Sequence, residues 1–422
     1  MFFIIRRNAI NLLTAGIALT LSCGMAAAGP KVYVGNFKDD TVSVIDTATA
    51  KVVATVPVAA GPHGMSITKD GKWVFVSGDN SSQVSVIDTA TDKVAQSIEV
   101  GKGPHGATLT PDGRQLLVAI NGEDRVVFVD AKKRTVTGFV EVPKPHTIAI
   151  RPDGKVAYVT SQLPGKFGLA VIDLGKRAVV RTVALDKPPR DGEFGAGGKA
   201  LYFTAAGLSA IEVLDPKTDK IVAEIPTGVS PHYVNLFPNT KLGVTVVQGP
   251  GELLLFDPAS NKPVGSIAVG KQPHWMTVSS DGKTAFVTNE GSNDLSIVNL
   301  TSRKVETVPV GNAPRKVVVQ PGPAQRAGNV SITNFAFAPG AITVKAGEPI
   351  TWTNNDGAPH TVTFKDRSAG SDSLSPGQTF TRVFEQPGTY EYFCSFHEFM
   401  TGRVTVQAKT AGKQARASLR AS

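Results

Sequence analysis

Four residues near the C-terminus are of the types that bind a soft transition metal. Cys394, His397 and Met400 are spaced as Cys-x2-His-x2-Met and are expected to share one loop, and His360 precedes them in the segment GAPHTV. One thiolate, two imidazoles and a weakly bound thioether are the donor set of type 1, or blue, copper sites, which carry electrons. The sequence therefore predicts that these four residues are the ligands of one copper ion.

The cysteine content favours a metal ligand over a disulfide. The chain has two cysteines, and Cys23 lies in the predicted export signal described below. An exported protein that keeps a single thiol, Cys394, among histidines and a methionine is expected to use that thiol as a ligand. A binuclear copper site, which needs two cysteines, is not expected.

The segments that precede these ligands alternate like the strands of a small sandwich, as in 341–345 and 349–354. With its four candidate ligands, the region 329–407 resembles the plastocyanin–amicyanin group of cupredoxins, and its short His-to-Met spacing is closest to amicyanin. Phe396 departs from that group, which often has proline before this histidine. The resemblance implies a cupredoxin β-sandwich whose copper cycles between Cu(I) and Cu(II), with electrons passing through the exposed edge of His397. The competing hypothesis is a sandwich that has lost its metal.

The region 31–320 repeats with a period of about 42 residues, in the range of propeller repeats. The segments 61–71 and 103–113 both contain Gly-Pro-His-Gly and end in Asp-Gly, and Val-Ser-Val-Ile-Asp occurs at 42–46 and again at 84–88. Four short strands joined by Asp-Gly turns describe one propeller blade. We count seven repeats and predict an all-β chain: a seven-bladed β-propeller followed by a cupredoxin β-sandwich. The repeats resemble the YVTN family of seven-bladed propellers.

The two ends of the repeat region are expected to complete one another. The segment from Lys31 supplies three strands of a blade, and the segment 316–320 supplies only a first strand, so together they would close the ring. The Pro- and Gly-containing segment 321–328 is predicted to be a linker. The small, basic segment 408–422 is predicted to be a disordered tail.

One position of the repeat is occupied by residues that can bind metals or anions. The residue after the proline of each repeat is a histidine or an arginine, in the order His63, His105, His146, Arg190, His232, His274 and Arg315. We expect these side chains to form a ring at one mouth of the central channel, as the blades enter their innermost strands. Three interpretations stand: hydrogen bonds that tie neighbouring blades, a second copper or a haem site, and a site for an anionic or organic ligand. Met65 and Met276 could add thioethers, although Ala107 and Ile148 at the same repeat position favour packing.

The N-terminus has the pattern of an export signal. Arg6 and Arg7 precede a largely apolar stretch that ends in small residues, so 1–28 is predicted to be a signal peptide. Sec and twin-arginine export both remain open, as does lipid attachment at Cys23. No later segment is apolar enough to span a bilayer. We therefore predict a periplasmic protein without an integral membrane segment once the signal is removed.

The net charge of +9 gives little support for nucleic-acid binding, because much of the excess lies in the predicted signal and tail. The first functional hypothesis is a periplasmic blue-copper electron-transfer protein. Its propeller would dock a redox partner, such as a cytochrome c or a dehydrogenase, or hold an oxidoreductase site at the ring. The alternative is a copper-binding or copper-handling protein whose propeller is only a scaffold or protein-binding module. Whether the chain is a copper-dependent oxidoreductase stays open.

Overall fold

The computed structural model describes residues 30–408 except 237–241, 280–281, 322–327 and 334. Within these residues the regular structure is β, apart from two single-turn 3-10 helices, η1 (Asn121–Glu123) and η2 (Ala196–Gly198). The predicted all-β fold class is confirmed. The predicted signal peptide, most of the predicted linker and nearly all of the predicted tail lie outside the described residues.

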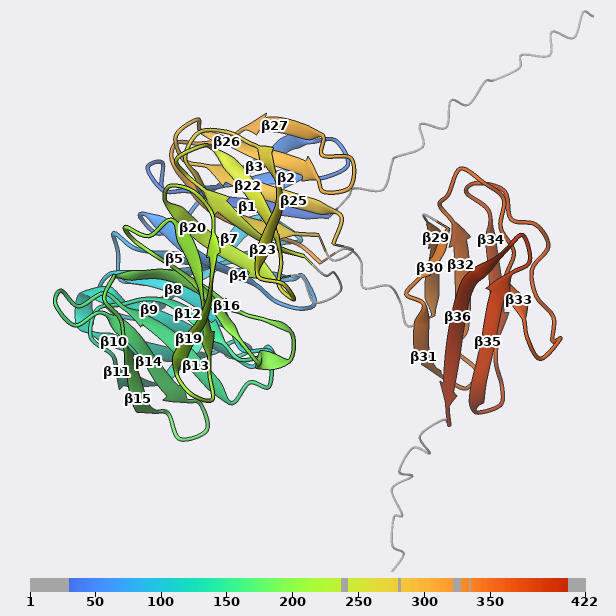
Figure 1. Cartoon of the computed structure of the whole chain (residues 1–422), viewed down its shortest axis with the longest axis horizontal. Helices are drawn as coiled ribbons and strands as arrows, with labels where there is room; N and C mark the ends of the chain where they lie inside the picture. The colour runs from blue at the N-terminus through green and yellow to red at the C-terminus, as the bar shows by residue number, and fades with distance from the viewer. Residues whose placement is uncertain (1–29, 237–241, 280–281, 322–327, 334, 409–422) are drawn as a thin grey trace, which may run out of the picture.

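Seven four-stranded antiparallel sheets follow one another along the chain and form the blades of a propeller (Figure 1). The first sheet contains β28 (Pro314–Val319), β1 (Lys31–Asn36), β2 (Thr41–Asp46) and β3 (Lys51–Pro57). The second contains β4 (Pro62–Ile67), β5 (Trp73–Gly78), β6 (Gln83–Asp88) and β7 (Lys93–Glu99). The third contains β8 (Pro104–Leu109), β9 (Gln115–Ile120), β10 (Arg125–Asp130) and β11 (Thr135–Glu141).

The remaining four-stranded blades repeat this order. The fourth contains β12 (Pro145–Ile150), β13 (Val156–Ser161), β14 (Gly168–Asp173) and β15 (Ala178–Ala184). The fifth contains β16 (Pro189–Phe194), β17 (Leu201–Ala205), β18 (Ala210–Asp215) and β19 (Lys220–Pro226). The sixth contains β20 (Pro231–Leu236), β21 (Gly243–Val247), β22 (Glu252–Asp257) and β23 (Lys262–Ala268). The seventh contains β24 (Pro273–Val278), β25 (Thr284–Asn289), β26 (Asp294–Asn299) and β27 (Val305–Pro309).

The ring closes by pairing the two ends of the repeat region. β28 pairs antiparallel with β1, with Val317 opposite Val34. The first strands of successive sheets contact one another around the whole circle, β28 against β4 included, and so surround the axis. The predicted closure is confirmed, and it covers the edge that an open series of blades would expose.

The repeated Asp residues have a local structural role. In the Val-Ile-Asp strand β2, Asp46 Oδ1 accepts hydrogen bonds from the backbone N–H groups of Ala48 and Thr49, and Asp88 and Asp130 make equivalent contacts. In the Asp-Gly turns, Gly71 has φ of 69°, which glycine adopts without steric cost. Each blade thus contains side chains that turn one strand into the next.

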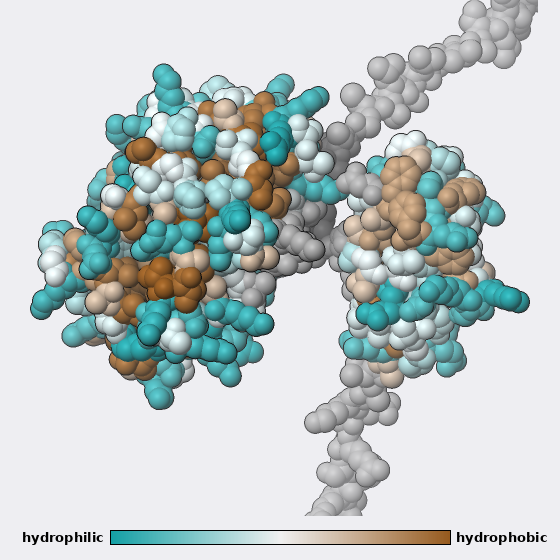
Figure 2. All heavy atoms as spheres, viewed as in Figure 1, coloured by the Kyte–Doolittle hydropathy of each residue, from teal (hydrophilic) through white to brown (hydrophobic). Residues whose placement is uncertain are grey.

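The C-terminal strands form two sheets of a sandwich. One contains β30 (Ala336–Ala338), β29 (Asn329–Thr333), β32 (Pro349–Asn354) and β34 (Thr379–Val383), and the other contains β31 (Ala341–Lys345), β36 (His397–Gln407), β35 (Gly388–Cys394) and β33 (Thr363–Phe364). Trp352 and Tyr392, both fully buried, face each other edge to face in the core between them. Figure 2 shows that the visible surface of this sandwich and of the propeller mixes hydrophilic and hydrophobic residues. In the described part of the chain no helix has the length and apolar character needed to cross a membrane.

Candidate metal centre

The three strongest candidate ligands are placed by the end of one strand, the start of the next and a short bridge. Cys394 is the last residue of β35, and His397 is the first residue of β36. His360 pairs with Leu374 through backbone hydrogen bonds in both directions, of 3.0 and 2.7 Å. The expectation that Cys394, His397 and Met400 share a loop needs correction. Because Cys394 pairs with His397 across a two-residue connection, His397 and Met400 lie on β36.

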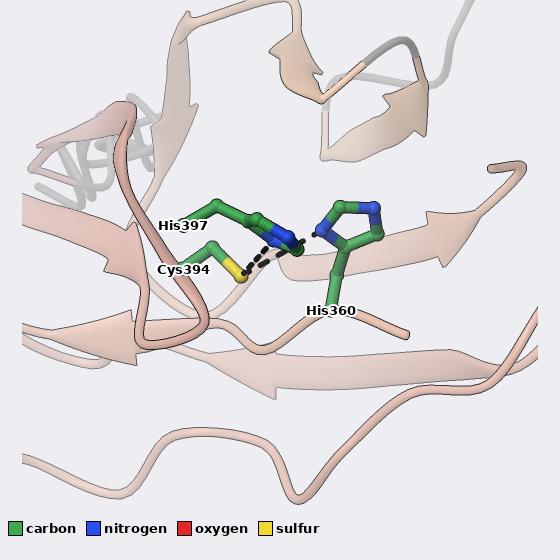
Figure 3. A group of neighbouring side chains, drawn as sticks. All are labelled: His360, Cys394 and His397. Carbon is green, nitrogen blue, oxygen red and sulfur yellow. Dashed lines mark hydrogen bonds between the residues drawn. The ribbon is translucent and has the colours of Figure 1, made fainter. Parts of the chain in front are cut away.

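Both imidazoles point at the cysteine sulfur (Figure 3). The distances from Cys394 Sγ to His360 Nδ1 and to His397 Nδ1 are both 3.6 Å. Bonds of about 2.0–2.3 Å, typical of imidazole and thiolate ligands, can join atoms at this separation through one ion. Among the described residues, these three form the one group of His, Cys, Asp and Glu ligand atoms that all lie within 4.8 Å of one another. The donor set therefore fits copper.

The sulfur is enclosed and receives hydrogen bonds. Cys394 is fully buried, and the backbone N–H of Thr361 donates to its Sγ at 3.4 Å. The Thr361 hydroxyl lies 3.9 Å from the same sulfur and accepts a hydrogen bond of 2.8 Å from the backbone N–H of Ser395. Such donors stabilise a thiolate in a site that excludes water. Thr361 was not predicted from the sequence, although it directly follows His360.

The far side of the His360 ring meets a carboxylate. His360 is fully buried, and its Nε2 lies 3.0 Å from Asp356 Oδ2, without the alignment of a hydrogen bond. The loop that carries both residues is held by Asn354, whose side-chain N–H groups donate to the carbonyl oxygens of Ala358 and Leu374. Asn354 and Asp356 were also missed. Their signal is the polar Asn-Asn-Asp-Gly turn shortly before the histidine.

Met400 and His397 differ in their exposure. Met400 is 2% exposed and belongs to the same apolar cluster as Cys394. His397 is partly exposed, and Phe335 and Phe399 meet its ring edge to face at centroid distances of 4.9 and 6.1 Å. Phe399 is 73% exposed and Phe396 is 53% exposed. The site thus reaches an apolar surface at His397, while its buried residues Cys394 and Met400 are shielded from water.

The ring predicted in the propeller is present. The ring centroids of His63 and His105 are 3.8 Å apart, those of His105 and His146 are 3.9 Å apart, and those of His232 and His274 are 4.0 Å apart. The predicted position needs a small correction. His63 is the second residue of β4, because pairing with β5 already begins at Pro62. The ring therefore lies within the innermost strands and not in the connections before them.

Several ring residues bind neighbouring blades. The Nδ1 atoms of His105, His146 and His274 lie 2.9–3.1 Å from the carbonyl oxygen of the next ring residue. Arg315 forms an ion pair of 3.0 Å with Glu290, and Arg190 donates a hydrogen bond to the Ser230 hydroxyl. These contacts agree with the interpretation that the ring residues hydrogen-bond neighbouring blades to one another.

Burial keeps the ring histidines neutral. It lowers the pKa of His63, His105, His232 and His274 well below the usual value, and it lowers the pKa of His146 to about 4. Met65 and Met276 are buried in separate apolar clusters between blades, which agrees with packing.

Two family sequence models match the chain. Residues 324–407 match copper binding proteins of the plastocyanin/azurin family, and residues 23–113 match the YNCE-like β-propeller. The chain is 37% identical over 94 residues to amicyanin-alpha of Methylorubrum extorquens, which covers 21% of this chain and 78% of the relative. It is 39% identical over 86 residues to plastocyanin of Scenedesmus fuscus, which covers 17% of this chain and 88% of the relative.

Solved structures share the propeller fold at low identity. Hydrazine synthase of Kuenenia stuttgartiensis aligns with a TM-score of 0.59 and 21% identity, over 64% of this chain and 92% of that chain. Apo AztD of Citrobacter koseri aligns with a TM-score of 0.55 and 17% identity, over 70% and 99%. These similarities describe the fold alone. Through its C-terminal domain the chain belongs to the plastocyanin/azurin family of copper-binding proteins, and that domain follows a YNCE-like β-propeller.

Proposed function

We propose that this chain is an exported, periplasmic electron-transfer protein that binds one copper ion through His360, Cys394, His397 and Met400. The observation that carries the proposal is the pair of 3.6 Å distances from both histidine Nδ1 atoms to the single buried cysteine sulfur. Copper held there supplies a one-electron couple between Cu(I) and Cu(II).

The protein's own residues hold the ligands in one arrangement. Leu374 and Asn354 fix the backbone around His360, and Thr361 fixes the sulfur of Cys394. Because the ligands come from paired strands and a hydrogen-bonded bridge, little rearrangement is expected when the charge of the site changes. Full burial of Cys394 and His360 keeps water from the ligand atoms.

His397 is the proposed route for electrons. It is the one histidine of the site with an exposed edge, and the exposed rings of Phe396 and Phe399 lie beside it in the sequence. An apolar surface of this kind supports brief docking, because it can be desolvated without unpaired charges. We propose that a periplasmic redox protein, such as a cytochrome c or a dehydrogenase, docks here.

The propeller is proposed to be a docking module or scaffold whose ring is structural. The Nδ1 contacts of His105, His146 and His274 to neighbouring blades support this role. A second copper, a haem or an oxidoreductase site at the ring is the alternative, and a metal analysis separates the two. Copper handling ranks second as a function, because a buried, thiolate-containing site is poorly suited to release its ion.

Metal content and absorption test the proposal directly. Purified protein is expected to contain one copper and no iron per chain, with the intense visible absorption of a copper–thiolate bond. Cys394→Ser should abolish this absorption, since it removes the thiolate. The double variant His105→Ala/His232→Ala is the control and should keep one copper and the full absorption. A wild-type chain without copper would refute the proposal. Stoichiometric iron, or a second copper, that is present in the wild-type protein and absent from the double variant would show a metal site at the ring and favour the alternative.

The docking surface can be tested without knowing the partner. Electron self-exchange between the reduced and oxidised protein requires two copies to meet at the electron exit. Phe399→Glu should slow this exchange at least tenfold, because it places a charge on the surface that must be desolvated. Phe139, which is 54% exposed on β11 of the propeller, supplies the matched control Phe139→Glu. Equal effects of the two substitutions on the exchange rate, measured by NMR line broadening, would contradict the proposed exit.

A further inference from the structure

A cavity of about 220 Å³ lies on the propeller axis. All seven innermost strands contribute to its wall. It has room for a molecule of several non-hydrogen atoms, and neither the ring of histidines nor the copper site accounts for it.

The charged groups of this cavity are confined to two strands. Asp191 and Glu193 come from β16, and Lys316 comes from β28. Two of the other repeats carry glycine, Gly64 and Gly106, where Asp191 and Lys316 stand in theirs. The charges therefore do not belong to the repeat pattern, and a structural role common to all blades does not explain them.

The amine of Lys316 is held by aromatic side chains. Its Nζ lies 2.7 Å from the centroid of the Trp275 ring, and Trp275 stacks on Tyr233 at a centroid distance of 3.7 Å. Within the part of the chain that the structure describes, no carboxylate forms an ion pair of 4.0 Å or less with Lys316. The amine and the two acids thus meet at one cavity without pairing directly.

Asp191 is also incompletely satisfied. It is 3% exposed, and its Oδ2 has no hydrogen-bond partner among the described protein groups. A buried carboxyl oxygen without a partner is costly, and a ligand in the cavity could supply one.

In this cavity the pKa values of the amine and of the two acids lie close together. Burial lowers the pKa of Lys316 to about 7, against the opposing pull of Asp191 and Glu193. Burial raises the pKa of Asp191 to about 7 and that of Glu193 to about 8. The Tyr233 ring centroid lies 5.7 Å from the Lys316 amine, and the charge of Lys316 contributes to the lowered pKa of three ring histidines, His105, His146 and His274. A substantial part of the amine is then unprotonated near neutral pH, beside acids that can give and take protons.

We propose that this cavity binds a small aldehyde or ketone and that Lys316 forms an imine with it. We take the ligand to be uncharged, since the step needs only its carbonyl group. Nζ attacks the carbonyl carbon, and the carbonyl oxygen takes up a proton from one of the two acids. The nitrogen then gives a proton back to that carboxylate, the re-formed acid protonates the hydroxyl, and water leaves as the C=N bond forms, which yields a protonated imine beside the carboxylate. The step needs no oxidant or reductant.

Reductive trapping tests the proposal on the full-length protein. The protein is incubated at pH 7 with propanal and sodium cyanoborohydride, which reduces an imine to a stable secondary amine, and labelled lysines are identified by peptide mass spectrometry. Lys316 is expected to be labelled on the order of a hundredfold faster than the exposed Lys217, because an ordinary lysine of pKa about 10.4 is almost entirely protonated at this pH. Labelling of Lys316 at or below the rate of Lys217 would overturn the proposal and would make Lys316 a structural partner of Trp275.

Substitution of the two acids tests whether they take part in the labelling of Lys316. The double variant Asp191→Asn/Glu193→Gln should slow the labelling of Lys316 at least tenfold while leaving that of Lys217 unchanged, because it removes both groups that can give a proton in the step. If the double variant does not fold, as judged by circular dichroism, the comparison of Lys316 with Lys217 in the wild-type protein is the test. A folded double variant that labels Lys316 at the wild-type rate would remove the acids from the proposed step.

Discussion

Asp356 lies directly behind one of the candidate copper ligands. Its Oδ2 lies 3.0 Å from Nε2 of the fully buried His360, whose Nδ1 faces the cysteine sulfur. A carboxylate behind a metal-binding imidazole orients the ring and increases its donation to the metal. Negative charge at this point favours the more highly charged oxidation state.

Asp356→Asn is therefore expected to raise the reduction potential. The substitution keeps the shape of the side chain and removes its charge, so Cu(II) loses stabilisation relative to Cu(I). We expect a rise on the order of 60 mV, the one-electron equivalent of a tenfold change in equilibrium constant. Cyclic voltammetry measures it.

The control is Glu385→Gln, an exposed carboxylate just before β35, at the opposite end of that strand from Cys394. It should leave the potential unchanged. A potential that is unaffected by Asp356→Asn would show that the carboxylate does not act on the ligand.

At the residue scale, sequence predicted what depends on residue type and order. His360, Cys394 and His397 were identified because few sites use their chemistry in this spacing, and the structure brings these three together. Thr361 was not identified, since its contact with the sulfur is made by a backbone N–H that every residue but proline carries. Lys316 and Asp191 were overlooked because they lie far apart in the chain and in no motif.

The innermost strands of the propeller pack too closely for side chains at some positions. A Cβ atom on Gly64 of β4 would lie 2.3 Å from the carbonyl oxygen of His105 and 2.6 Å from the amide nitrogen of Ala107, both on β8. These are backbone atoms, which cannot move aside without shifting a whole strand. Glycine in the Pro-His-Gly motif is thus required by the approach of neighbouring blades.

Gly64→Ala is expected to destabilise the propeller by roughly 3 kcal/mol, the upper part of the range for overpacking. The midpoint of chemical unfolding, followed by circular dichroism, should fall accordingly. Gly175→Ala is the matched control, since its nearest neighbour, Asp173 Oδ1, would be 3.4 Å away. A Gly64→Ala protein as stable as the control would show that the strands can separate at little cost.

At the element scale, local turn chemistry made the blades predictable. The Asp-Gly turns and the Val-Ile-Asp strands act within a few residues, as the Asp46 contacts to Ala48 and Thr49 show. The position of His397 and Met400 on β36 was not predictable in the same way. It depends on how Cys394 pairs across the hairpin, where the register shifts after Phe393.

The whole propeller is expected to lose stability as the pH falls from 6.5 to 5. Burial lowers the pKa of all five ring histidines in the folded state, so the unfolded chain takes up protons in this range that the folded chain does not. Asp191 and Glu193 oppose this, because their raised pKa values give the folded state protons that the unfolded state lacks. Asp79 and Glu212, whose pKa values burial also raises, add to the opposition mainly at the acidic end. Five histidines outweigh these groups above pH 5.

Thermal unfolding at a series of pH values measures this balance. Circular dichroism follows the β-structure, and visible absorption follows the copper site separately. The midpoint of the circular dichroism transition should fall from pH 6.5 to pH 5, and the fall should be smaller in His105→Asn/His232→Asn. A midpoint that is constant or rises over this interval would mean that the ring is protonated in the folded protein.

The propeller can close only when its last strand in the sequence, β28, pairs with its first, β1. β28 is the last propeller strand to be synthesised, and until it arrives β1 has an open edge. The same strand carries Arg315 and Lys316, so the ring of histidines and arginines and the cavity each lack a charged member until the final step. A propeller that has not closed therefore has an incomplete ring and an incomplete cavity, and Lys316 reaches the axis only when β28 pairs with β1.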